Sequence, residues 1–310
     1  MIFVEMYGRL GNQLFRYAVA RRLQIEYYPN EKLVLSFNQA RKESDKSFQN
    51  TLEDFRVSDF EIYSKKGKVL FNESNLKQKI IMIMYFFCLK MTKENDMKRQ
   101  VNISSFFSNT LNKNGIYWFR NGYFDLNKSK IKNKFISGNF EDPRYFTNIK
   151  GILQKELLPK KTSKNDNSHL EEIIEESQSI CVSIRRGDFL DPKYKKLHYV
   201  CDEKYFEKAI TIIKTKVKNP VFIFFSDDIE WVKTNIKTYG IICYYESGKD
   251  EVFEKLRLMS MCKHFIISNS TFSWWAQYLC KNPYKIVISP RKWLNNNEES
   301  GLIDESWIKI

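Results

Sequence analysis

The sequence of 310 residues predicts an α/β protein with parallel sheets, arranged as two medium domains or one large one. A strand over residues 1–4, a tight turn over 8–13, a helical pattern over 14–25 and a strand over 33–35 resemble the start of a βαβ unit. In the second half, apolar runs of strand length alternate with helical patterns. A hydrophobic content of 43% is sufficient for a sizeable core.

The alternation in the second half is regular and predicts a nucleotide-binding domain. Strands are expected over 180–184, 221–225, 265–267 and 286–288, and helices over 205–217, 253–262 and 272–280. Polar clusters follow three of these strands, and ligands of open parallel sheets bind beyond the carboxyl ends of the strands.

The segments between these patterns set the expected domain organisation. Residues 40–75 are polar and irregular. The run over 80–89 (IIMIMYFFCL) is too short to span a bilayer, so we expect a buried core helix, with a helix on a membrane surface as the alternative. Residues 160–168 (KKTSKNDNS) form the expected linker between a first domain over 1–159 and a second over 169–310.

Cysteine usage and the N-terminus predict a cytoplasmic protein. None of the six cysteines has C-x-x-C spacing, and several lie in apolar runs. The N-terminus has neither a basic segment nor a long apolar segment typical of a signal peptide. We therefore expect a reducing compartment and no disulfide framework.

The positive charge is concentrated in the first half of the chain. The whole chain carries a net charge of +14, and residues 1–150 hold 26 Lys and Arg against 15 Asp and Glu. Nucleic acid, anionic lipid headgroups or a phosphorylated carrier would each suit such a surface. The alternative is that the composition, which is rich in Asn, Lys and Ile, reflects genome bias, and that the positive charge then says little about a binding partner.

The segment ICVSIRRGD over residues 180–188 predicts an anion site. A buried strand ends in Arg185 and Arg186, whose guanidinium groups suit phosphate oxygens. The alternative is that one of the two arginines pairs with Asp188 and simply holds the loop.

Two further polar clusters point to the same edge. Asp227 and Asp228 follow a strand, and a carboxylate can accept two parallel N–H donors such as those of guanine. Ser270 and Thr271 precede a helix, whose N-terminus favours phosphate. The alternatives are a turn or cap for the aspartates and plain helix capping for the hydroxyls.

Missing motifs narrow the chemistry. The sequence has no Walker A motif, no G-x-G-x-x-G, no D-x-D and no zinc-ligand spacing among its three histidines. We therefore expect no metal and no cofactor. Arginine can replace a metal ion in neutralising a leaving diphosphate. A metal-independent transfer from a nucleotide-diphosphate sugar fits these features.

Four ordered motifs resemble the bacterial α-1,2-fucosyltransferases of glycosyltransferase family 11. They span nearly the whole chain: GRLGNQLFRYA over 8–18, G-x-F at 138–140 leading to Tyr145 and Phe146, IRRGD over 184–188, and CKHFIISNSTFSWW over 262–275. The Ser226-Asp227-Asp228 segment before Trp231 also matches. One position departs from the pattern, because Ser183 stands where the family motif has histidine.

The resemblance implies a GT-B fold of two Rossmann-like domains facing across a cleft. It also implies GDP-fucose as donor, inversion without a metal, and a galactose-terminated acceptor, either free or lipid-linked. We expect this acceptor to bind the basic first domain. In this reading Arg185 grips the diphosphate, and Asp227 or Asp228 reads guanine. The remaining donor-side residues implied are Gly11, Asn12, Ser183, Arg186, Ser270, Thr271 and Ser273.

Some assignments stay open at this point. Asp188 is our candidate catalytic base, with Glu5, Glu141 and Asp142 as further candidates. Transfer from another GDP-sugar is an alternative function. A non-catalytic basic protein that binds RNA or a membrane surface is another, against which the four ordered motifs argue. We expect no nucleic-acid partner and a cytoplasmic location, with the inner membrane face as a peripheral alternative.

Overall fold

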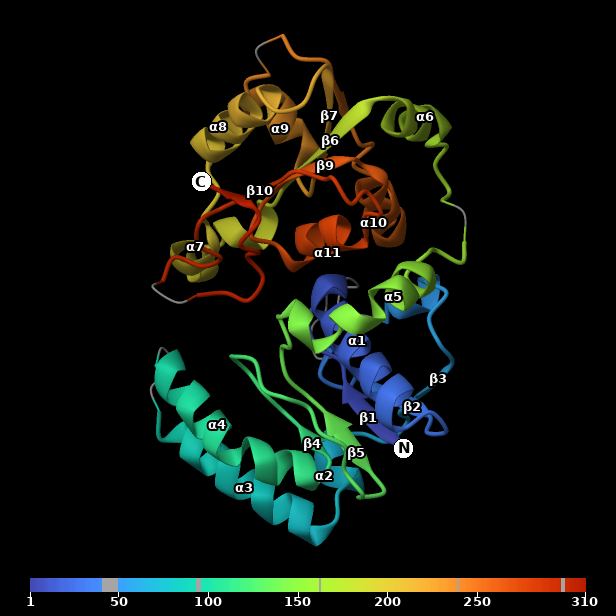
Figure 1. Ribbon diagram of the computed structural model, residues 1–310, viewed down its shortest axis with the longest axis vertical. Coiled ribbons are helices and arrows are strands. Elements are labelled where there is room, and N and C mark those ends of the chain that lie inside the picture. The colour runs from blue at the N-terminus through green and yellow to red at the C-terminus, as the bar shows by residue number, and fades with distance from the viewer. Residues whose placement is uncertain (41–49, 93–95, 162, 239, 297–298) are drawn as a thin grey trace. The chain divides into compact units, whose positions relative to one another are not determined.

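The computed structural model describes residues 1–40, 50–92, 96–161, 163–238, 240–296 and 299–310. The chain forms two compact units, shown in Figure 1, and each has its own sheet. The first unit contains residues 1–53 and 57–156, and the second contains 54–56 and 157–310. Every strand pairing within a sheet of the described residues is parallel. The predicted α/β fold with two Rossmann-like units is confirmed.

The first unit has a five-stranded sheet in the order β3-β2-β1-β5-β4. Its strands are β1 (Ile2–Glu5), β2 (Leu33–Ser36), β3 (Phe60–Ile62), β4 (Ile116–Tyr117) and β5 (Lys134–Ile136). Its α-helices are α1 (Leu10–Tyr27), α2 (Val69–Glu73), α3 (Leu76–Lys90), α4 (Met97–Lys113) and α5 (Lys150–Glu156).

The second unit has a six-stranded sheet in the order β11-β10-β9-β6-β7-β8. Its strands are β6 (Gln178–Ile184), β7 (Pro220–Ser226), β8 (Cys243–Tyr245), β9 (His264–Ile267), β10 (Val287–Ser289) and β11 (Ile308–Lys309). Its α-helices are α6 (Ser168–Glu176), α7 (Pro192–His198), α8 (Glu203–Lys214), α9 (Ile229–Asn235), α10 (Val252–Met261) and α11 (Thr271–Leu279).

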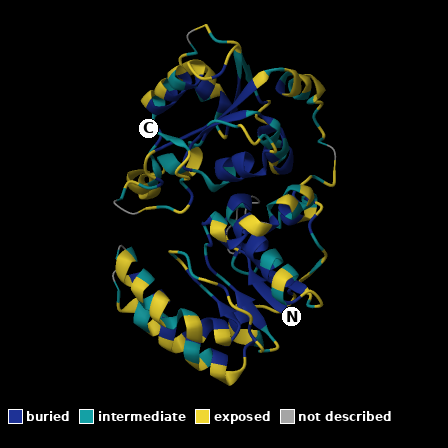
Figure 2. Ribbon diagram, in the orientation of Figure 1, coloured by how far each residue is buried: buried dark blue, intermediate teal, exposed yellow. Residues whose placement is uncertain are grey.

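The core of the second unit lies between the central strands and α8. Ile180, Val182, Phe222 and Phe224 are fully buried in β6 and β7, and α8 presents its buried face, including Ile210, to the same cluster. Most residues of the central strands are apolar because helices cover both faces of a parallel sheet. Figure 2 shows these strands as buried and the outer faces of the helices as exposed.

Two expectations about the first unit are corrected. The turn expected over 8–13 ends early, because α1 begins at Leu10, so Gly11 and Asn12 lie in its first helical turn. Within the described part of 40–75, expected to be irregular, the chain forms a short 3₁₀-helix (Leu52–Asp54), β3 and α2. Neither β3 nor α2 shows a periodic pattern, since each is five residues long or shorter.

The expectation that residues 80–89 form a buried core helix is also wrong. The run does lie in a helix, α3, which is capped by a reciprocal pair of hydrogen bonds between Asn75 and Gln78. In α3 only Gln78, Met82 and Tyr85 are buried. None of the described helices combines the length and the apolar character that a bilayer span requires.

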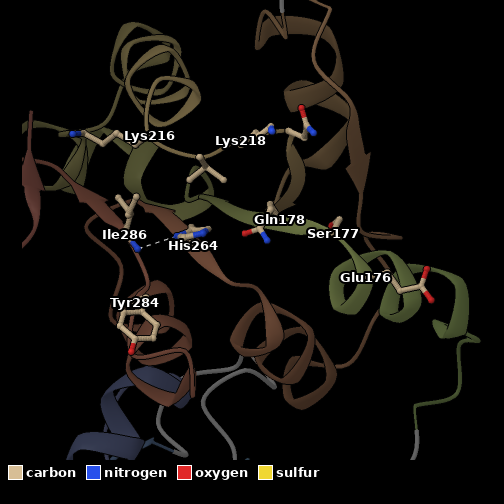
Figure 3. Close-up of a pocket in the computed structure, with 10 residues that line it drawn as sticks. Glu176, Ser177, Gln178, Lys216, Lys218, His264, Tyr284 and Ile286 are labelled. Atoms are coloured by element: carbon tan, nitrogen blue, oxygen red, sulfur yellow. Dashed lines mark hydrogen bonds between the residues drawn. The ribbon is translucent and has the colours of Figure 1, made fainter.

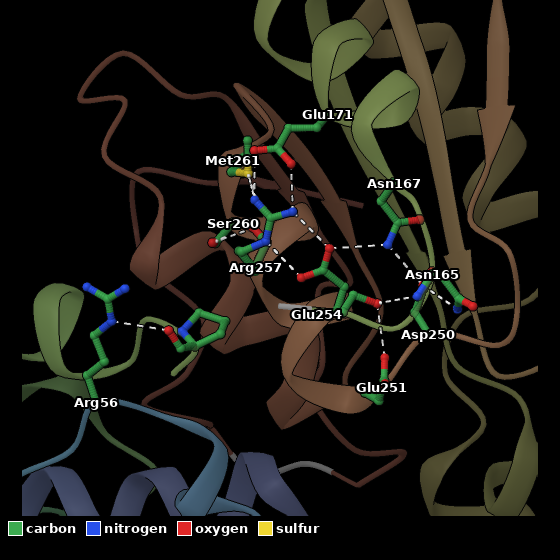
Figure 4. A network of polar contacts seen from close by, with 12 residues as sticks. Arg56, Asn165, Asn167, Glu171, Asp250, Glu251, Glu254, Arg257, Ser260 and Met261 are labelled. Carbon is green, nitrogen blue, oxygen red and sulfur yellow. Dashed lines mark hydrogen bonds and ion pairs between the residues drawn. The ribbon is translucent and has the colours of Figure 1, made fainter. Parts of the chain in front are cut away.

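The segment expected as a linker contacts helix α10 of the second unit. Asn165 and Asn167 each donate a hydrogen bond to Asp250, at 2.9 and 3.0 Å, and Asn167 also donates to Glu254. Glu254 pairs in turn with Arg257, as Figure 4 shows. These contacts attach the described residues after 162 to the second unit.

Candidate functional site

Three polar loops meet at the carboxyl edge of the second sheet. Strand β6 lies between β9 and β7, with Ile184 opposite Ser226 and Ser183 opposite Ile267. The chain therefore leaves all three strands at the same level of the sheet. The register brings the arginine loop after β6 next to Asp227 on one side and to the Ser268–Ser270 loop on the other. The convergence expected from the sequence is present in the fold.

Arg185 is held by two carboxylates. Its Nε and Nη2 atoms donate to Asp188 Oδ1 at 3.1 and 2.5 Å, and its Nη1 lies 2.8 Å from Asp227 Oδ2. The ion pair with Asp188, which the sequence raised as the loop-holding alternative, is thus formed. A guanidinium group carries five N–H donors, and these contacts engage three of them. The contacts within the described part of the chain leave two donors for a ligand.

Arg186 is fixed more tightly than Arg185. Its backbone N–H donates to Asp227 Oδ1 at 2.9 Å, and its Nε lies 3.3 Å from Asp228 Oδ2. The guanidinium group also lies 3.3 Å from the centre of the Trp231 ring, as a cation–π contact. With its side chain only 13% exposed, Arg186 is placed to orient the loop.

Gly187 leaves room for the contact between Arg185 and Asp227. A Cβ atom at Gly187 would collide with Asp227 Oδ2, the atom that pairs with Arg185. A side chain at this position would therefore separate the Arg185–Asp227 pair.

The two aspartates after β7 have different surroundings. Both oxygens of Asp227 contact the arginine loop, so this carboxylate organises Arg185 and Arg186. Asp228 caps α9 by accepting the Trp231 backbone N–H at 3.2 Å, and its side chain is 45% exposed. Asp228 is the more accessible carboxylate for a ligand.

The loop after β9 brings hydroxyl groups to the same edge. Ser183 Oγ lies 2.7 Å from Ser273 Oγ, and Ser273 Oγ lies 3.2 Å from Ser268 Oγ. Ser270 is the N-cap residue of α11, yet its side chain makes no capping hydrogen bond. The capping role raised for this residue is therefore absent. Thr271 is the first residue of α11, at its positive end.

A buried ion pair that the sequence did not reveal supports the aspartate loop. Glu246 follows β8 and is 2% exposed, and its Oε1 lies 2.8 Å from Lys255 Nζ. Lys255 Nζ also donates to the Ser226 carbonyl at 3.3 Å. The polar Glu246 at the end of an apolar run was an available signal. It was missed because β8 is three residues long.

In the first unit, Arg16 joins two of the sequence motifs. Its Nε donates to the Gly138 carbonyl and its Nη1 to the Tyr7 carbonyl, each at 2.6 Å. Burial lowers the pKa of Arg16 to about 10. Gly8 has φ +71°, a left-handed conformation that favours glycine, and its carbonyl accepts a bond from Gln13. Arg16 therefore fixes the loop at Tyr7 that leads into α1, and Gly11 and Asn12 lie in the first turn of that helix.

The other candidate bases also lie in the first unit. Burial raises the pKa of Glu5 and that of Glu141. Glu5 accepts a bond from Ser137, whereas Asp142 is paired with Arg144 at 2.6 Å. The raised pKa values make the Glu5 and Glu141 carboxylates stronger proton acceptors than an ordinary glutamate.

A separate depression lies at the opposite edge of the second sheet. Figure 3 shows it at the amino ends of β6 and β9, lined by Gln178, Lys216, Lys218, His264 and Tyr284 among others. It has a volume of about 750 Å³. Because β6 runs from Gln178 to Ile184, this depression is at the far end of the strand from Arg185. In the described residues no group of three or more His, Cys, Asp or Glu side chains could hold a metal ion.

Comparison with known proteins agrees with the ordered motifs. The family described as "Glycosyl transferase family 11" matches residues 1–310. An O-antigen biosynthesis glycosyltransferase, WbnK, of Escherichia coli is 30% identical over 322 residues, covering 98% of each chain. An alpha-1,2-colitosyltransferase of Escherichia coli is 26% identical over 317 residues, covering 100% of this chain and 99% of the other. Human galactoside alpha-(1,2)-fucosyltransferase 1 is 32% identical over 101 residues, covering 32% and 28%.

Proposed function

Since the chain belongs to glycosyl transferase family 11 and is a glycosyltransferase, we propose that it transfers L-fucose from GDP-fucose to the 2-hydroxyl of a galactoside. The α-1,2 linkage would form with inversion. The observation that carries the proposal is Arg185, which is held at the carboxyl edge of the sheet with two N–H donors left by its contacts to described residues. The names of the colitosyl and fucosyl relatives support the linkage and a fucose-like sugar.

The donor diphosphate would bind between Arg185 and the start of α11. Arg185 offers a charged fork, and the first turn of α11 offers backbone N–H groups at the positive end of a helix dipole. The hydroxyls of Ser270 and Thr271 stand at that end. This arrangement brings positive potential to a diphosphate without a metal ion. The guanine base would bind on the Asp228 side, where the exposed carboxylate can accept from two parallel N–H groups.

The same residues would promote the reaction. As the bond between the anomeric carbon and the diphosphate breaks, negative charge grows on the leaving oxygens. A preorganised Arg185 stabilises that charge more in the transition state than in the ground state. Asp188 and Asp227 hold the guanidinium so that it need not reorganise during the step.

The base that accepts the proton of the acceptor hydroxyl is assigned to Asp188 in this proposal. Its side chain is 42% exposed, which suits contact with an incoming acceptor. Because Asp188 also pairs with Arg185, a lower rate on its substitution could come from either role. The pH dependence of the rate must therefore be measured as well. Glu5 and Glu141, with raised pKa values, are the alternatives in the first unit.

A donor-by-acceptor screen tests the proposal. Purified protein is given GDP-fucose, GDP-colitose, GDP-mannose or UDP-galactose with a series of β-galactosides, and nucleotide release is followed. We expect turnover with GDP-fucose and a product whose linkage is α-1,2 by NMR. Turnover with UDP-galactose alone would contradict it. Preference for GDP-colitose would favour the alternative function, transfer of a sugar other than fucose from its GDP donor, which the name of the colitosyl relative supports.

A further inference from the structure

Helix α3 presents an apolar face to the exterior of the first unit. Its exposed large apolar side chains recur every three to four residues and therefore share one side of the helix. They are Leu76, Ile80, Ile83, Met84 and Phe87, with Met91 directly after the helix. Ile83 is 61% and Phe87 64% exposed. We call these six residues the apolar α3 face.

The apolar α3 face lies directly opposite the side of the helix that packs on the protein. The buried residues Gln78, Met82 and Tyr85 point to the other side, where Tyr85 contacts Ser104 of α4 at 2.7 Å and the ring of Trp118. With 100° between successive residues, the centres of the two sides differ by roughly half a turn. The helix is therefore held by one side and leaves the other without a covering element in the described residues.

Lysines border the apolar α3 face. By the same helical spacing, Lys79 and Lys90 lie along one flank and Lys77 along the other. The described residues 76–92 and 96–113, which contain α3 and α4, hold six Lys and Arg and a single acidic residue, Asp96. An apolar stripe with cationic flanks is the pattern of a helix that lies in the interface of an anionic bilayer.

We propose that the apolar α3 face docks on the surface of an anionic lipid bilayer, with the helix axis in the membrane plane. Its 15 residues rise about 22 Å, which is too short to cross the hydrocarbon core. The apolar side chains would enter the boundary between headgroups and acyl chains, and the lysines would reach the phosphates. A second copy of the face is a poorer occupant, since it would bring lysines against lysines. The proposal does not depend on the donor sugar.

Sedimentation with vesicles tests the proposal on the full chain. Vesicles of phosphatidylcholine alone are compared with vesicles containing about a third phosphatidylglycerol, at about 50 mM and about 500 mM salt. We expect binding to the anionic vesicles at low salt, weakened by high salt and weak on the neutral vesicles. Each neutralised lysine, as in Lys79→Gln or Lys90→Gln, should weaken binding about fivefold.

Serine substitutions of the apolar residues distinguish docking of the apolar α3 face from non-specific electrostatic attraction of a basic protein to the vesicles. Ile83→Ser combined with Phe87→Ser should lower vesicle binding about tenfold or more, because less apolar area enters the interface. The matched control is Ile242→Ser with Tyr284→Ser, two residues of the second unit that are 61% and 86% exposed. The control should bind as the parent does. All four positions are exposed, so the variants should fold, which circular dichroism checks.

Three results would overturn the proposal. The first is no binding to anionic vesicles at low salt. The second is equal binding by the Ile83→Ser, Phe87→Ser variant and the parent, which would mean that the net positive charge alone causes vesicle binding. The third is a dimer in analytical ultracentrifugation that this double variant converts to monomer, which would assign the face to a second copy of the chain.

Discussion

The hydroxyl groups of Ser183 and Ser273 lie 2.7 Å apart and join strand β6 to helix α11. Ser183 is the position at which the sequence departs from the histidine of the family motif. Ser183 is 6% exposed, and its hydrogen bond to Ser273 shows that the serine at this position has a structural partner within the fold. It also connects the arginine loop with the helix start proposed to bind the diphosphate.

The Ser183–Ser273 pair should behave as a coupled pair in a double-mutant cycle. Ser183→Ala and Ser273→Ala should each lower the free energy of unfolding by about 1 kcal/mol. The loss of unfolding free energy in the double variant should be smaller than the sum of the two single losses by about 0.5 kcal/mol or more. The reason is that each single substitution already removes the same hydrogen bond. Ser179→Ala, on the same strand but bonded to Ile174, should be additive with Ser273→Ala. Strict additivity of Ser183→Ala and Ser273→Ala would contradict the pair.

Replacement of Arg185 should abolish most of the activity without unfolding the protein. Loss of one preorganised charged donor typically lowers the rate about 10²–10³-fold, so we expect this for Arg185→Ala. Arg185→Lys should also be poor, because an ammonium group cannot contact Asp188 and Asp227 as a fork. Lys233→Ala removes an exposed cation of α9 and should keep normal turnover. Near-normal kcat for Arg185→Lys would rule out the fork.

The Asp188→Asn variant distinguishes two roles of Asp188, that of a catalytic base and that of a residue that only holds Arg185. An asparagine keeps an oxygen that can accept from the guanidinium group, so a purely holding role predicts a small loss. A base role predicts a large loss of kcat and disappearance of the acidic limb of the pH–rate profile. We expect the second result. If the acidic limb persists in Asp188→Asn, the base lies elsewhere, and Glu5→Gln and Glu141→Gln become the next variants.

GDP should stabilise the protein against heat more than ADP does. A carboxylate that accepts from guanine N1–H and N2–H is left unpaired by adenine, which lacks this pair of donors. Asp228→Asn should reduce the difference between the two nucleotides. Asp227→Asn should reduce the effect of both, since Asp227 organises the arginines. Equal shifts in Tm by ADP and GDP would contradict guanine recognition.

Chelation of divalent metal ions should leave turnover largely intact. The proposed site neutralises the diphosphate with Arg185 and the N-terminus of α11, so EDTA should change kcat by less than about twofold. Rates are measured after dialysis against EDTA and again after addition of Mn²⁺ or Mg²⁺. Full loss of activity that either ion restores would overturn the metal-free mechanism.

The sequence predicted the elements whose pattern is local. The β1-to-β2 opening and the long α8 have apolar periodicities that require no knowledge of distant residues. The clusters at Arg185, Asp227 and Ser270 were placed at strand ends, and parallel strands bring such ends to one edge. The register of β6 with β7 and β9 then places them side by side.

What a residue does within a cluster depended on contacts across the fold. The sequence left Asp227 and Asp228 equivalent, yet Asp227 binds both arginines and Asp228 caps α9. Glu246 and Lys255 were overlooked because Glu246 follows β8, a strand of only three residues, and its pairing with Lys255 forms only when α10 packs beside that strand.

By itself, the sequence determined the α/β class, the ordered motifs and the basic charge of the first half, since all three are properties of residue order and type. Only the tertiary structure decided that one side of the helix over 80–89 is exposed. An apolar run is buried only where other elements cover it, and among the described residues α3 is covered on the side of Met82 and Tyr85. Burial is a property of the neighbours that the fold supplies, and a segment's own composition does not contain them.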